Sequence, residues 1–81
     1  MYGYKSEKDL YDNLVPALKV KKRLLDKSGY DNISIEDIWN YLKESRWSKA
    51  IGLELADMVS DIVHVNNLDL VKYKESNNKL I

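Results

Sequence analysis

The sequence predicts a small all-α protein, a single-domain bundle of about four helices. Apolar residues recur at helical spacing in four segments, serines that can cap a helix precede two of them, and no segment shows the alternation typical of a β-strand. The chain has 81 residues, enough for one domain. A chain of this length buries only roughly 60–65% of its unfolded surface, so each large apolar side chain matters to the core.

The composition indicates a soluble globular domain and argues against several classes of function. Hydrophobic residues make up 44% and charged residues 32% of the chain, which is inconsistent with wholesale disorder. Thirteen basic and thirteen acidic residues give a formal net charge of zero, so charge-driven binding to nucleic acid or a membrane surface is not expected. Cysteine is absent, which excludes disulfides and thiolate metal sites. We find no apolar run near the roughly 18 residues of a membrane span and no signal peptide, so we expect no membrane span and a cytoplasmic location.

The first helix is expected to begin at Ser6, an N-cap with Asp9 three residues later, after a flexible arm of residues 1–5. Pro16 interrupts this helix because proline lacks the N–H and disfavours helical angles in the residue before it. We therefore predict a kink or a division into two abutting helices. Ser28-Gly29 ends the segment, with glycine at the C′ position. Its apolar residues fall within one face of about 140°: Leu10, Tyr11, Leu14, Ala17, Leu18, Leu24 and Leu25.

The second helix is expected to span residues 35–44, with Ser34 as its N-cap. Glu36 and Asp37 lie in its first turn, where the helix dipole favours carboxylates. Its apolar face consists of Ile35, Ile38, Trp39 and Leu42. A connector of residues 45–50 follows.

Two shorter helices are expected in the C-terminal part of the chain. The third spans about residues 52–63, and its apolar face comprises Leu55, Met58, Val59, Ile62 and Val63. Asn66-Asn67 ends it, and Asn67 can cap a short fourth helix. Residues 74–81 are polar, and we predict a frayed tail there. The single helical domain is thus predicted to span residues 6–73.

A run of basic residues in the first helix is a candidate binding patch. Lys19, Lys22, Arg23 and Lys27 gather on one helical face, opposite the leucines. They are either contacts for the phosphates of RNA or the solvated side of an amphipathic helix. No aromatic residue lies among them on which a base can stack.

Lys21 is the exception to this pattern because it falls in the middle of the leucine face. A lysine at such a position must extend its ammonium group to solvent or find a carboxylate. We predict an inward Lys21 paired with Asp37, Asp57 or Asp61, unless a kink at Pro16 rotates it outward.

The third helix carries an acidic stripe that includes Asp57 and Asp61. Together with His64 these residues have a spacing that suits a divalent metal, but nothing nearby completes a ligand set, so a solvated acidic face is the better interpretation. The stripe also opposes DNA binding through a helix-turn-helix, because its charges repel phosphate. We expect no cofactor, no metal and no catalytic residue. One histidine, no cysteine and three scattered glycines do not favour an enzyme.

The two tryptophans differ in their surroundings. Trp39 lies on the apolar face of the second helix and is expected in the core. Trp47 lies in the connector beside Arg46, a composition typical of an interaction hot spot, although Trp47 can equally cap the small core. Tyr41 lies on the flank of the second helix, as a core edge or a partner contact.

Several of these residues together resemble a known family. Leu14-x-Pro16, Lys21, Gly29-Tyr30, SIEDIWNYL at residues 34–42, Arg46-Trp47 and DMVSDI at residues 57–62 resemble the ComN-type post-transcriptional regulators of low-GC Gram-positive bacteria. The resemblance covers roughly residues 10–73. It implies a non-enzymatic cytoplasmic regulator, linked to late competence gene expression, that acts through mRNA or a protein that handles mRNA. The connector differs from the family pattern, since a more basic segment with proline is expected after the second tryptophan.

Two functions remain open on this evidence. The first is a protein-interaction adaptor with weak or indirect mRNA contact, whose partner surface includes Tyr41, Arg46, Trp47, Asp57 and Asp61. The alternative is direct RNA binding through Lys19, Lys22, Arg23 and Lys27. A homodimer is also possible, with the basic face of the first helix against the acidic stripe of a second copy.

Overall fold

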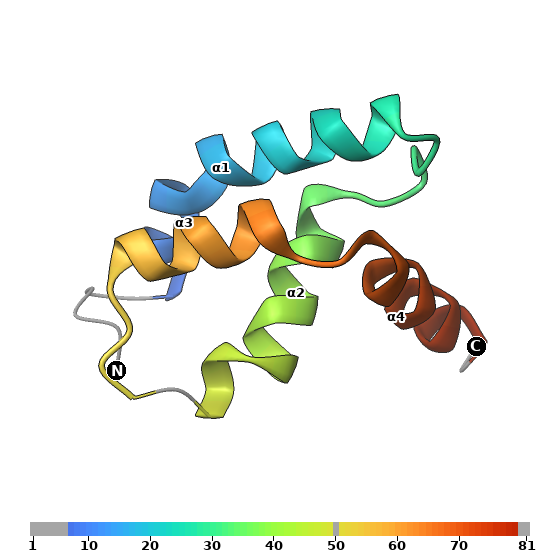
Figure 1. Cartoon of the computed structure of the whole chain (residues 1–81). Coiled ribbons are helices and arrows are strands. Elements are labelled where there is room, and N and C mark those ends of the chain that lie inside the picture. Colours follow the sequence, from blue (N-terminus) through green and yellow to red (C-terminus); the bar gives the residue numbers. More distant parts are fainter. Residues whose placement is uncertain (1–6, 50, 80–81) are drawn as a thin grey trace.

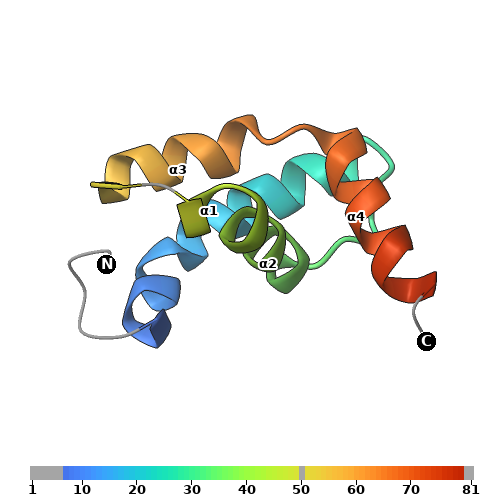
Figure 2. The ribbon, with the colours of Figure 1, turned by 90° about the horizontal axis from the view of Figure 1, so that it is seen from below.

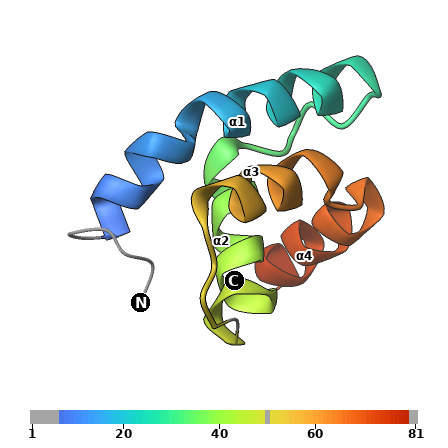
Figure 3. The same cartoon turned by 60° about the vertical axis from the view of Figure 1, so that its left-hand side comes forward.

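Four α-helices and one short 3₁₀ helix form the fold in a computed structural model, which describes residues 7–49 and 51–79. The elements are α1 (Glu7–Lys27), α2 (Ile35–Ser45), η1 (Trp47–Lys49), α3 (Leu55–His64) and α4 (Asn67–Lys79), so the predicted all-α class is confirmed. In Figures 1 and 3, α3 lies along α1 and runs in the same direction, while α2 crosses both. The view from below in Figure 2 shows α4 at the end of the bundle, where it packs on α2.

Every helix and η1 contribute to one core. Leucines from four turns of α1 meet Ile38, Trp39 and Leu42 of α2, and α3 supplies Met58 and Ile62. The remaining large core side chains come from the loop before α2, from η1 and from α4. The complete set of buried apolar residues is Leu10, Leu14, Leu18, Leu25, Ile33, Ile38, Trp39, Leu42, Trp47, Met58, Ile62 and Leu70.

Helix α1 continues through Pro16 as a single element from Glu7 to Lys27. The predicted division into two helices is therefore wrong, and a kink stays a prediction. Proline removes only one backbone donor, the N–H that would bond to the Asp12 carbonyl. The leucines on both sides of Pro16 pack into the same core, and this packing holds the two halves of α1 together. The predicted Ser6 cap and the arm of residues 1–5 lie outside the described residues.

The ends of α1 and α2 follow the capping rules. Gly29 has φ +90°, and Tyr30 N–H donates to the Leu25 carbonyl at 2.8 Å, the pattern of a Schellman motif. At the start of α2, the Ser34 hydroxyl accepts from Asp37 N–H and the Asp37 carboxylate accepts from Ser34 N–H, a capping box.

The fourth helix differs from its prediction at both ends. Its cap is Asn66 rather than Asn67, because the Asn66 side-chain oxygen accepts from the N–H groups of Leu68 (2.8 Å) and Asp69 (3.2 Å). The helix also extends to Lys79, so residues 74–79 of the predicted frayed tail are helical. Lys74 supplies a reason, since its ammonium group lies 2.8 Å from the carboxylate of Asp37 in α2.

Candidate binding face on the first helix

The connector between α2 and α3, which contains Arg46 and Trp47, has a structural role. Trp47 is only 2% exposed, and its indole N–H donates to Asp61 Oδ2 at 2.9 Å. The guanidinium of Arg46 lies 3.0 Å from the other carboxylate oxygen, Oδ1. Asp61 therefore ties two consecutive connector residues to α3. Of the two alternatives for Trp47, the core position is the correct one, and its ring is not accessible to a partner.

The other predicted partner contacts also have roles within the fold. The ring of Tyr41 packs edge-on against Tyr73 of α4, with ring centroids 5.4 Å apart. The Asp57 carboxylate accepts from Glu54 N–H at 3.2 Å and so caps α3. Arg46, Asp57 and Asp61 line one shallow pocket, and Arg46 lines a second one with Tyr41, but the buried ring of Trp47 lines neither of these two pockets.

Lys21 is buried, as predicted, but its partner is not a carboxylate. It is 6% exposed, and its ammonium group donates to the backbone carbonyls of Val65 (2.9 Å) and Val63 (3.4 Å). The predicted pairing with Asp37, Asp57 or Asp61 is therefore wrong. The physical reason is that α3 ends at this point, and the last carbonyls of a helix lack intrahelical donors and carry partial negative charge.

Three of the four predicted basic residues form a free cationic stripe. Lys19, Arg23 and Lys27 are exposed and make no hydrogen bond or ion pair within residues 7–49 and 51–79. Lys22 differs, because its ammonium group lies 2.8 Å from the Asp26 carboxylate and 3.1 Å from the Asp31 carbonyl oxygen. The stripe available to a ligand is thus narrower than predicted.

Two aliphatic residues lie beside this stripe, and their exposure was not predicted. Val20 is 44% exposed and Leu24 is 46% exposed. The exposure of Leu24 shows that its predicted place in the core is wrong: it lies at the edge of the apolar face, about 100° from the buried Leu25, where neighbouring elements do not bury it. We call the surface formed by Lys19, Val20, Arg23, Leu24 and Lys27 the outer face. In Figures 1 and 3, α2 and α3 lie on one side of α1, and no helix lies on its opposite side.

The described residues have few features of a membrane-spanning segment or of a metal site. No helix among them is long and apolar enough to cross a membrane. Nor do residues 7–49 and 51–79 contain a group of three histidine or carboxylate side chains placed to hold a metal ion. The outer face, rather than a pocket with reactive groups, is thus the strongest candidate site.

These features define a small all-α domain with an uncovered helix face as its candidate site. A family model described as post-transcriptional regulator matches residues 7–78. The chain is also 33% identical over 66 residues to the post-transcriptional regulator ComN of Bacillus subtilis (strain 168), which covers 80% of this chain and 67% of the relative. The chain belongs to the ComN-type post-transcriptional regulator family. No solved structure matches it.

Proposed function

We propose that this regulator is a non-enzymatic adaptor whose outer face binds an acidic, partly apolar surface of a protein partner. The observation that supports this proposal is the exposure of Val20 and Leu24 among three cations that make no ion pair or hydrogen bond with the described residues. Binding is favoured when a partner covers exposed aliphatic side chains, because removing them from water lowers the free energy. The flanking cations favour a partner with carboxylates and disfavour a basic one.

A second candidate is direct RNA binding by the same helix, as the family description allows. Lys19, Arg23 and Lys27 favour it, because unpaired cations can contact phosphates without first losing an internal ion pair. Two features favour the protein partner instead. The outer face has no aromatic ring for base stacking, and the formal net charge of the chain is zero. A link to competence stays a prediction of the family resemblance.

The test compares two probes on the same isotope-labelled protein. One is a synthetic amphipathic helical peptide with glutamates beside leucines, and the other is a single-stranded RNA oligonucleotide. We expect the peptide to shift the amide resonances of α1 around Val20 and Leu24. The double substitution of Val20→Ser and Leu24→Ser should weaken peptide binding about tenfold.

The control removes charge and leaves the aliphatic residues in place. Lys19→Gln, Arg23→Gln and Lys27→Gln together should reduce the salt dependence of peptide binding. If only RNA shifts these resonances, with a logarithmic salt slope of about −2 for three phosphate contacts, the RNA candidate replaces the adaptor. If neither probe shifts the outer face, both candidates fail.

A further inference from the structure

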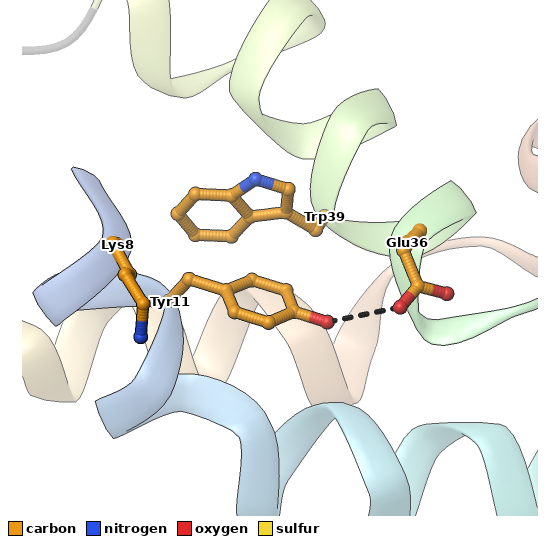
Figure 4. A pocket seen from close by; sticks show the side chains of 4 residues that line it. All are labelled: Lys8, Tyr11, Glu36 and Trp39. Carbon is orange, nitrogen blue, oxygen red and sulfur yellow. Dashed lines mark hydrogen bonds between the residues drawn. The ribbon is translucent and has the colours of Figure 1, made fainter.

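A shallow groove lies between the N-terminal half of α1 and the start of α2, away from the outer face. Its volume is about 380 Å³, and it is lined by Lys8, Tyr11, Glu36 and Trp39. Figure 4 shows the rings of Tyr11 and Trp39 beside each other, with the Glu36 carboxylate at one end and Lys8 at the other. The groove thus combines aromatic walls with one acidic end, formed by Glu36, and one basic end, formed by Lys8.

The aromatic walls are held in a fixed arrangement. The rings of Tyr11 and Trp39 meet edge to face, with centroids 5.1 Å apart, and Trp39 is 7% exposed. The ammonium group of Lys43 lies 5.6 Å from the centre of the Trp39 ring, within the range of a cation–π contact. Since Lys43 already lies over the Trp39 indole, the half-buried ring of Tyr11 is the more accessible aromatic wall of the groove.

The Glu36 carboxylate, at the acidic end of the groove, can accept more hydrogen bonds than the one from Tyr11. Tyr11 O–H donates to Glu36 Oε2 at 3.2 Å, while an ionised carboxylate can accept about four hydrogen bonds. Glu36 is exposed, so a ligand can reach the remaining positions. The nearby Lys8 ammonium group lies 2.9 Å from Asp12, an ion pair that offsets its repulsion of a cationic ligand.

We propose that this groove binds the guanidinium group of an arginine from a protein partner. A guanidinium is planar and weakly hydrated, so it stacks on aromatic rings, and its parallel N–H groups match a carboxylate. An ammonium group lacks both properties, and an acidic ligand would meet a like charge at the Glu36 end of the groove. The groove and the outer face are formed by different residues, so this inference goes beyond the proposed function and does not depend on it.

The direct test uses a short capped peptide, Gly-Arg-Gly, and a matched peptide with citrulline in place of arginine. Citrulline keeps the shape of the side chain but has no charge. We expect the arginine peptide to shift the Trp39 indole N–H resonance and the Tyr11 ring resonances of the full chain. The citrulline peptide should bind at least about threefold more weakly, since it loses the ionic and cation–π contributions.

A matched pair of variants locates the contact. Glu36→Gln should weaken arginine binding about threefold, whereas Glu75→Gln, which removes an exposed carboxylate from α4, should leave binding unchanged. Tyr11→Phe keeps the aromatic wall and should bind at least as well as the parent chain. Equal effects of the two glutamine variants, or no shift at Tyr11 and Trp39, would overturn the proposal. A mononucleotide that shifts these two residues more strongly than the arginine peptide would also overturn it.

Discussion

The ammonium nitrogen of Lys21 lies 2.9 Å from the carbonyl oxygen of Val65, directly after the last turn of α3. This contact joins α1 to the end of a helix 44 residues further along the chain. Burial lowers the pKa of Lys21 because it removes water from the ammonium group. The carbonyls of Val63 and Val65 offset part of that cost, and one lysine replaces a conventional C-terminal cap for α3.

We expect Lys21→Met to lower the free energy of unfolding by about 1–2 kcal/mol, because two terminal carbonyls lose their donor. Urea unfolding followed by circular dichroism measures the change, and Lys19→Met is the control for an exposed lysine of the same helix. The lowered pKa means that the unfolded chain binds this proton more tightly. The advantage of the parent chain over Lys21→Met should therefore widen as pH rises toward the ordinary value of 10.5. A gain in stability for Lys21→Met would contradict the capping role.

The stabilisation from the α2–α4 contact is expected to depend on pH, because it involves the carboxylate of Asp37. Burial alone raises the pKa of this carboxyl, but the hydrogen bond from Lys74, those from Ser34 and the charge of Lys74 together lower it below the ordinary 3.8. The unfolded chain thus binds the proton more tightly. The stabilisation is complete above pH 3.8 and is lost as pH falls through the lower, folded-state pKa.

Asp37→Asn should therefore reduce the unfolding free energy by about 1 kcal/mol at neutral pH, and the difference from the parent chain should shrink below pH 3.8. Lys74→Met isolates the ion pair from the capping box, and Lys72→Met is the control for an exposed lysine of α4. Unfolding curves at a series of pH values provide the measurement. If the difference in unfolding free energy between Asp37→Asn and the parent chain did not change with pH, the carboxylate charge would not contribute to stability.

Trp47 is expected to be a folding residue. Trp47→Ala should remove about 3–5 kcal/mol, a large part of the roughly 4–12 kcal/mol expected for a domain of this size. The helical circular dichroism should therefore decrease sharply at moderate temperature. Trp47→Phe keeps most of the packing but loses the bond to Asp61, and a loss of about 1–2 kcal/mol is expected. A fully helical Trp47→Ala chain that unfolds like the parent would contradict the core assignment.

Features encoded in local sequence were predictable, and those created by contacts between helices were not. Ser34 and Gly29 act on their own helix ends, so neighbouring residues were enough to identify them. The partner of Lys21 is backbone, which has no side-chain signal in the sequence. The burial of Trp47 depends on the approach of α3, which brings Asp61 to its indole nitrogen.

The candidate site was predicted in part for the same reason. Helical spacing correctly placed the basic stripe opposite the core, since that relation lies within one helix. The exposure of Leu24 depends on how much of α1 its neighbours cover, which helical spacing does not contain. The groove at Tyr11 and Trp39 arises only where α1 and α2 meet, so no motif indicated it.

Pro16 provides a final prediction about α1. It is exposed near the middle of a 21-residue helix, where it provides no N–H for the carbonyl of Asp12. Pro16→Ala restores that donor and introduces the residue with the highest helix propensity, so the free energy of unfolding should rise by about 1–3 kcal/mol.

Lys19→Ala is the matched control, because it changes an exposed residue of the same helix that already has its backbone donor; its effect should stay within about 0.5 kcal/mol. Amide exchange of α1 gives an independent measurement, since protection should increase around the restored bond. An unchanged or lower stability for Pro16→Ala would show that the rigidity of proline in the unfolded chain outweighs the missing hydrogen bond. An increase would show that α1 tolerates Pro16 at a cost, and that packing of the leucines on both sides keeps the helix continuous.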